Sequence, residues 1–69
     1  MMTDNDKKVH QFIADYAKSQ GVSPSYSEIA GHMGYSKPAA HKAVKRLVAA
    51  GVAVIDKSEH DWRSIRLVE

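Results

Sequence analysis

The sequence predicts a mainly helical α+β fold in which three helices are followed by a two-stranded β-hairpin. Apolar residues recur at helical spacing in three successive segments up to residue 50, and the spacing then changes to the alternation typical of strands. Gly21, Gly34 and Gly51 separate these segments, and glycine is the residue that most often ends a helix. A chain of 69 residues suffices for one domain with a small core, so we expect a single domain over residues 1–69.

The first helix is predicted to run from the start of the chain to Gly21. Thr3 or Asp4 can cap its first turn, and the acidic side chain of Asp6 suits the positive end of the helix dipole there. Its apolar stripe follows helical spacing and comprises Val9, Phe12, Ile13, Tyr16 and Ala17. We assign this helix a structural role, because such a stripe packs into a core.

A capping box begins the second predicted helix, directly after a turn at Pro24. Ser25 can accept a hydrogen bond from the backbone N–H of Glu28, whose carboxylate can accept one from the backbone N–H of Ser25. The helix is short because Gly34 ends it. Its inward-facing side chains are expected to be Ile29, Ala30 and Met33.

The third helix is predicted over residues 37–50 and is basic. Ser36 can cap it, and Pro38 is accommodated in its first turn, where a missing N–H has no intrahelical partner. The expected inward stripe comprises Ala40, Val44, Leu47 and Val48. The opposite face is expected to carry Lys37, His41, Lys42, Lys45 and Ala49, with Arg46 at its flank.

The last segment is predicted to form the hairpin. Residues 52–55 are apolar and mostly β-branched, and residues 56–61 are polar. Residues 62–68 read as the second strand, in which Ile65 and Leu67 share one face. We expect Trp62 to anchor this hairpin on the core.

Positive charge is concentrated in the middle of the chain. Residues 29–55 carry four basic side chains and no acidic one, whereas residues 1–28 and residues 56–69 each sum to −1. Such a focus attracts polyanions. Two helices joined by a short glycine-containing turn form a helix-turn-helix unit, whose second helix fits the major groove of duplex DNA. The order of elements therefore predicts a winged helix-turn-helix that binds double-stranded DNA, with the hairpin as its wing.

Residues 22–35 carry a more specific pattern, with a proline, a capping serine, a Glu-Ile-Ala triplet and a Gly-aromatic end. This pattern resembles the second-helix signature of the LexA repressor N-terminal domain, and residues 47–52 and 65–67 also fit that family. The resemblance covers nearly the whole chain and implies a transcriptional repressor module. LexA proteins continue into a self-cleaving peptidase domain that dimerises them, which these residues lack. We therefore expect a piece of a longer protein or a small stand-alone regulator, of the kind that phages or mobile elements encode.

The third helix is expected to make most of the contacts with DNA. Base edges are expected to be read by Ala39, His41 and Lys42, since a methyl group can meet thymine and lysine favours guanine. Phosphate contacts, which carry no sequence information, are expected from Ser36, Lys37, Lys45 and Arg46. Enterobacterial LexA differs at Pro38, His41 and Lys42, so its operator sequence does not carry over.

Further contacts are expected from outside that helix. Tyr26, near the start of the second helix, either touches phosphate or packs on the first helix. The candidate wing contacts are Lys57, His60 and Arg63. Asp56, Glu59 and Asp61 lie among these wing residues and could instead repel DNA or bind a protein.

Several classes of function are not expected. The chain has no cysteine, and its four histidines lack the spacing of metal ligands, so we predict no metal site. No catalytic constellation or phosphate loop stands out, so we predict neither an enzyme nor a cofactor or small-molecule ligand. The polar start and the lack of a long apolar run predict a protein of the cytoplasm, associated with the nucleoid.

An alternative prediction is a winged-helix module that binds a protein, for instance a host regulator or RNA polymerase. The same fold serves both uses. The third helix contains Ala39, Ala43 and Ala49, which would make its surface smooth. An apolar patch there would favour a protein partner, whereas the acid-free segment favours DNA. On DNA, a homodimer is expected if the operator is palindromic.

Overall fold

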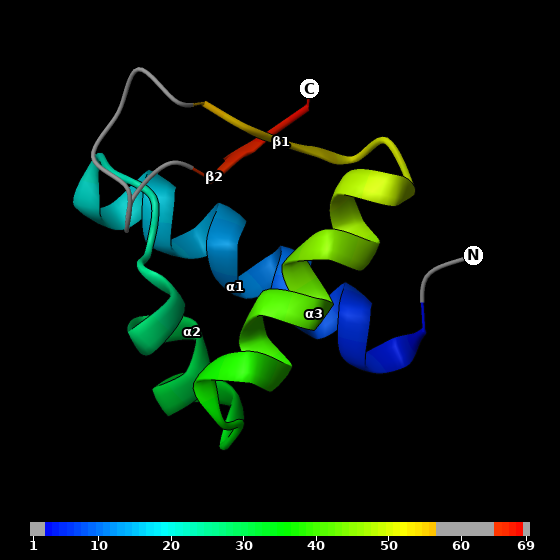
Figure 1. The fold of residues 1–69 in the computed structure, drawn as a ribbon. Coiled ribbons are helices and arrows are strands. Elements are labelled where there is room, and N and C mark those ends of the chain that lie inside the picture. Colours follow the sequence, from blue (N-terminus) through cyan, green and yellow to red (C-terminus); the bar gives the residue numbers. More distant parts are fainter. Residues whose placement is uncertain (1–2, 57–64, 69) are drawn as a thin grey trace.

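The computed structural model describes residues 3–56 and 65–68, and it contains the predicted elements in the predicted order (Figure 1). The helices are α1 (Asp4–Gln20), α2 (Tyr26–Met33) and α3 (Lys37–Ala49). The strands are β1 (Ala53–Ile55) and β2 (Ile65–Leu67), which pair antiparallel. The predicted class is thus confirmed as three helices followed by a two-stranded hairpin. Within the described residues, no helix is long and apolar enough to cross a membrane.

Capping boxes determine where α1 and α2 begin. At α1 the cap is Thr3, whose hydroxyl accepts a hydrogen bond from the backbone N–H of Asp6 at 3.1 Å, while Asp4 is already helical. At α2 the predicted box is confirmed, with 3.1 Å from the backbone N–H of Glu28 to Ser25 Oγ. The backbone N–H of Ser25 donates in return to Glu28 Oε1 at 2.8 Å. Both helices therefore start where local hydrogen bonding satisfies their free N–H groups.

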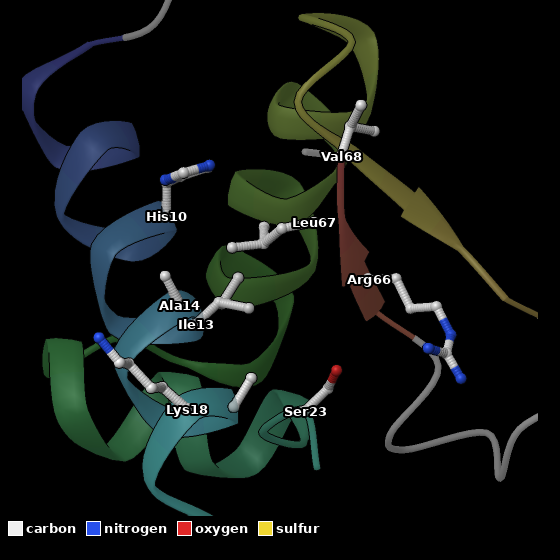
Figure 2. Close-up of a pocket in the computed structure, with 9 residues that line it drawn as sticks. His10, Ile13, Ala14, Lys18, Ser23, Arg66, Leu67 and Val68 are labelled. Atoms are coloured by element: carbon white, nitrogen blue, oxygen red, sulfur yellow. The ribbon is translucent and has the colours of Figure 1, made fainter. Parts of the chain in front are cut away.

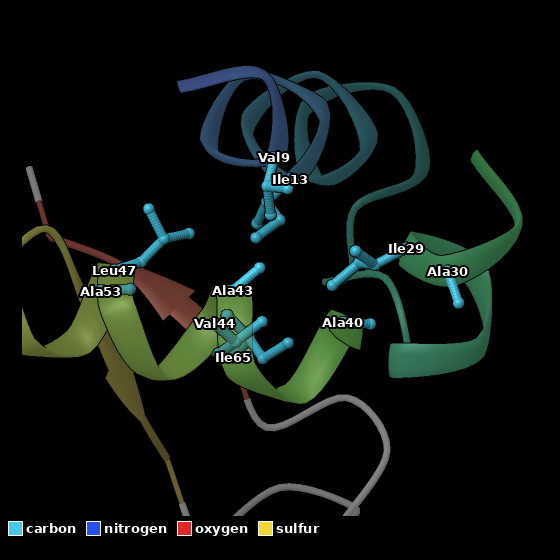
Figure 3. Close-up of a cluster of buried hydrophobic side chains, with 10 residues drawn as sticks. All are labelled: Val9, Ile13, Ile29, Ala30, Ala40, Ala43, Val44, Leu47, Ala53 and Ile65. Carbon is cyan, nitrogen blue, oxygen red and sulfur yellow. The ribbon is translucent and has the colours of Figure 1, made fainter. Parts of the chain in front are cut away.

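The core lies between the three helices and the inner face of the hairpin (Figure 3). Side chains from α1 and α2 point toward α3, and β1 and β2 each add one residue. Its buried members are Val9, Ile13, Ile29, Ala30, Ala40, Ala43, Val44, Leu47, Ala53 and Ile65. Six of these ten are β-branched or leucine side chains, and the other four are alanines, which allow the elements to approach closely.

The buried stripe of α3 differs from the predicted one. Ala43 is fully buried, so the expectation that it smooths the exposed surface of this helix is wrong. Val48, predicted to face inward, is 38% exposed. The buried side chains follow i, i+3, i+4 and i+7 from Ala40 to Leu47, and Val48 lies one residue beyond that stripe, at its edge. The predicted and observed stripes share Ala40, Val44 and Leu47. The packing of α1, α2 and β1 around α3 decided that Ala43 rather than Val48 is the fourth buried residue.

The hairpin is held against the helices at its inner face. The register pairs Ala53 with Leu67 and Ile55 with Ile65, and the ladder continues where the backbone N–H of Val68 donates to the carbonyl of Val52 at 2.9 Å. The predicted shared face is confirmed, because Ile65 is buried and Leu67 packs partly buried against the core. The first strand begins one residue later than predicted and the second ends at Leu67 rather than at residue 68, while residues 62–64 of the predicted second strand, Trp62 included, lie outside the described residues.

The turn before α2 also contacts the hairpin. The hydroxyl of Ser23 donates a hydrogen bond to the backbone carbonyl of Ile65 in β2. The hydroxyl of Tyr16 in α1 donates to Glu28 Oε2, whereas Oε1 of the same carboxylate takes part in the capping box. Through these two bonds, the turn that positions α2 is tied to both α1 and β2.

Candidate nucleic-acid interface

A three-residue turn joins α2 to α3. Gly34 ends α2 with φ of 71°, a left-handed conformation that glycine adopts without strain. The backbone N–H of Tyr35 donates to the carbonyl of Ala30 at 2.9 Å, which closes the turn. Ser36 then caps α3 by accepting a hydrogen bond from the backbone N–H of Ala39 at 3.3 Å. The turn places α2 and α3 side by side as a helix-turn-helix unit (Figure 1).

The exposed side of α3 is basic. Lys42 and Lys45 are exposed and lie opposite the buried stripe, and Lys37 and His41 are exposed along one flank of that side. Ser36 is exposed at the helix start, whereas Ala39 is partly buried. No acidic residue occurs anywhere in α3. Five of the residues predicted to contact DNA are thus brought together on one accessible surface, which we call the basic face: Ser36, Lys37, His41, Lys42 and Lys45.

Tyr26 makes a contact that the sequence did not reveal. Its ring stacks on the imidazole of His41, with the ring centroids 3.7 Å apart and the planes at 13°. Tyr26 is partly buried and packs against the core, and this burial raises the pKa of its hydroxyl above the usual 10.0. The phenol therefore stays uncharged near neutral pH. The stack joins the first turn of α2 to the second turn of α3.

Arg46 is paired with an acid in α1. Its Nε donates to Asp6 Oδ1 at 2.9 Å and to Asp6 Oδ2 at 3.1 Å. The Asp6 side chain is only 1% exposed, while that of Arg46 is 49% exposed. Sequence reasoning missed this pair because the two residues are 40 positions apart. Arg46 was predicted to contact phosphate, and the structure shows that its Nε is already engaged with Asp6.

The environment of Asp6 predicts a pH dependence of stability. Burial acts to raise the pKa of this carboxyl, but the hydrogen bonds from Arg46 and Thr3 and the charge of Arg46 outweigh burial, so the pKa lies below the usual 3.8. A carboxyl whose pKa is lower in the folded than in the unfolded state contributes its full stabilisation at pH values above the unfolded-state pKa. That contribution is lost as pH falls below about 3.8 through the folded pKa.

We therefore expect the free energy of unfolding, measured by urea titration, to fall between pH 5 and pH 3. In the variant Asp6→Asn this fall should be smaller, because the ionisable group is gone. An equal fall in both proteins would show that other carboxyls carry the acid sensitivity.

The wing part of the prediction falls largely outside the described residues. Lys57, His60 and Arg63 lie there, so their contacts stay predictions. In the described part of the hairpin, Arg66 Nε donates to Asp56 Oδ2 at 2.6 Å. At least one of the acids in this region is thus paired with a base of the neighbouring strand.

A groove of about 890 Å³ lies between α1 and β2 (Figure 2). Its apolar floor includes Ile13 and Leu67, and Lys18 and Arg66 are at its sides. None of the described residues predicted to contact DNA lines it, so it is separate from the basic face. Among residues 3–56 and 65–68, no group of three or more His, Cys, Asp or Glu side chains could hold a metal ion.

The helix-turn-helix unit, the basic face of its second helix and the hairpin that follows define a winged helix-turn-helix protein. Comparison with known proteins agrees with this class. The helix-turn-helix domain family matches residues 2–52, and the chain belongs to that family.

The chain is also similar to the LexA repressor of Magnetococcus marinus, with 34% identity over 68 residues. This match covers 99% of the chain and 29% of that repressor, so the chain spans less than a third of the relative's length. The predicted resemblance to LexA repressors is confirmed.

Proposed function

We propose that this protein is a sequence-specific double-stranded DNA-binding transcriptional regulator. The observation that carries the proposal is the basic face of α3, which is exposed and free of acidic residues while the opposite stripe of the helix is buried. A helix with this division of charge, held by a helix-turn-helix, suits the major groove. The similarity to a LexA repressor supports the same function.

In this proposal, the start of α3 approaches the bases. His41 and Lys42 read base edges. The methyl group of Ala39 is partly buried, and it contacts the methyl group of a thymine. Lys37 and Lys45 contact phosphates on either side of the groove. Ser36 and the free N–H groups of the first helical turn add a phosphate site at the positive end of the helix dipole.

The protein-binding alternative is weakened by the packing of α3. Ala43, one of the three alanines on which that alternative rests, is fully buried. Ala39 is partly buried, and the large apolar side chain exposed on α3 is Val48, at the edge of the buried stripe. Ala49 is exposed as predicted, so the exposed surface of this helix combines lysines with small apolar side chains, and its lysines favour DNA over a protein partner.

The proposal extends to how the protein acts. As a repressor, it would bind as a homodimer to palindromic half-sites about one helical turn apart, and it would lie with the nucleoid in the cytoplasm. A phage or mobile-element source is also part of this proposal. Both Arg46 and the wing residues Lys57 and Arg63 would add phosphate contacts, and Tyr26 would line the same surface.

A salt titration tests the proposal. The domain is titrated onto a fluorescently labelled duplex of mixed sequence, and anisotropy is measured across a series of salt concentrations. We expect the logarithm of the binding constant to fall linearly with the logarithm of salt, by about 0.9 for each phosphate contacted. Lack of binding even at low salt would overturn the proposal and direct the search to a protein partner.

A further inference from the structure

The geometry points to Tyr26 as a positioning residue that holds the imidazole of His41 in the orientation from which it reads a base. This inference rests on the proposed DNA-binding function. It assigns Tyr26 a role other than the phosphate contact or the packing on α1 that the sequence predicted. The role is specificity, because a base-reading side chain discriminates only when its hydrogen-bonding edge has a defined direction.

The phenol ring is itself held in place. Tyr26 is the first residue of α2, directly after the cap Ser25, and its partly buried ring packs against the core. The capping box at Ser25 and Glu28 is tied to α1 by the hydroxyl of Tyr16. The ring of Tyr26 therefore projects from a helix start that three hydrogen bonds hold in place.

His41 has no comparable support of its own. It is exposed on the second turn of α3, where an imidazole can otherwise occupy several rotamers. Stacking at 3.7 Å and 13° covers one face of the ring, so what remains accessible is the other face and the edge that carries the nitrogen atoms. A side chain ordered before binding loses less conformational entropy on the DNA.

A second stack in the same protein supplies a matched control. Phe12 of α1 stacks on His32 of α2, with centroids 4.1 Å apart and planes at 9°. This pair resembles the stack of Tyr26 on His41 in geometry, but neither of its residues belongs to α3. Loss of the Phe12 stack should therefore affect packing without affecting the choice of base.

The test begins with a selection. The wild-type protein selects its preferred duplex from a library randomised over two helical turns, and affinities are then measured for that duplex and for a scrambled duplex of equal composition. Tyr26→Leu should weaken binding to the selected duplex about three- to tenfold, the range expected for one side chain that must be ordered on binding. Binding to the scrambled duplex should be unchanged, as should the selectivity of Phe12→Leu.

Two further variants separate positioning from direct contact. Tyr26→Phe keeps the stacked ring and loses the hydroxyl, so it should bind as the wild type does. In a His41→Ala background, Tyr26→Leu should have no further effect, because the residue acts through the imidazole. In the DNA-free protein, the ring-current shift of the His41 imidazole protons should be present in Tyr26→Phe and lost in Tyr26→Leu, and this readout shows the stack itself.

Several outcomes would overturn the inference while leaving DNA binding intact. These are an equal loss on both duplexes, a loss that persists in the His41→Ala background, a loss in Tyr26→Phe as large as in Tyr26→Leu, or a selection that yields no preferred sequence. If Tyr26→Leu fails to fold, Tyr26→Phe and His41→Ala still decide between a hydroxyl contact and the stack. Failure of the wild-type protein to bind any duplex at low salt would instead overturn the proposed function.

Discussion

Replacement of both Lys42 and Lys45 by glutamate is expected to abolish duplex binding at physiological salt while the fold is retained. Both side chains are exposed on α3 opposite its buried stripe, so neither contributes to the core. Each reversal replaces an attraction to DNA by a repulsion, and together they should weaken binding by about two orders of magnitude or more. The slope of the salt dependence should fall by about one, since Lys45 is the phosphate contact of the two and Lys42 reads a base.

The matched control reverses Lys7 and Lys8 in α1. Both are exposed, and this double variant undergoes the same change in net charge. It should lose only the small, long-range part of the attraction, which salt screens. Anisotropy titrations measure the affinities, and circular dichroism with thermal melting checks the fold. A folded variant with Glu at positions 42 and 45 that binds as tightly as the parent would refute the assignment of α3 as the recognition helix.

Replacement of Arg46 by alanine is expected to destabilise the fold more than a surface arginine would. The change leaves the Asp6 carboxylate buried with only its contacts to Thr3, and an unpaired buried charge is costly. Because Arg46 is itself half exposed, we expect a loss of about 2–3 kcal/mol, below the cost of breaking a fully buried pair. In a domain of this size, each kcal/mol lowers Tm by about 4–8 °C.

Two comparisons test the cause of that loss. In Asp6→Ala/Arg46→Ala the buried charge is gone, so the double variant should be more stable than Arg46→Ala alone. Arg66→Ala breaks an ion pair whose two side chains are both partly exposed, and its cost should stay below about 1 kcal/mol. Urea titrations of the four proteins measure these differences. Unchanged stability of Arg46→Ala with a loss of DNA affinity would show that its main role is the predicted phosphate contact.

The Asp6–Arg46 pair also bears on how α3 is oriented. It joins the first turn of α1 to the last turns of α3, while the stack of Tyr26 on His41 joins α2 to the second turn of α3. Helix α3 is thus fastened near both of its ends to the helices that support it. Rigid support of this kind limits the ways in which its lysines can meet a groove, which favours defined contacts over diffuse attraction.

The sequence by itself determined the order of elements and most of their ends. Helical spacing, the capping box at Ser25 and the glycine at the end of α2 are local signals, because each depends on residues within a few positions of one another. The basic character of α3 is equally local. These features sufficed to predict a winged helix-turn-helix and the residues of its basic face.

Only the tertiary structure decided which side chains meet across the fold. The burial of Ala43 in place of Val48 depends on how α1, α2 and β1 surround α3, and nothing in the helical spacing distinguishes two adjacent stripes. The pairing of Asp6 with Arg46 and the stack of Tyr26 on His41 join residues far apart in the chain. Such contacts arise from the angle and distance at which helices pack, and this geometry is set by all the core side chains together.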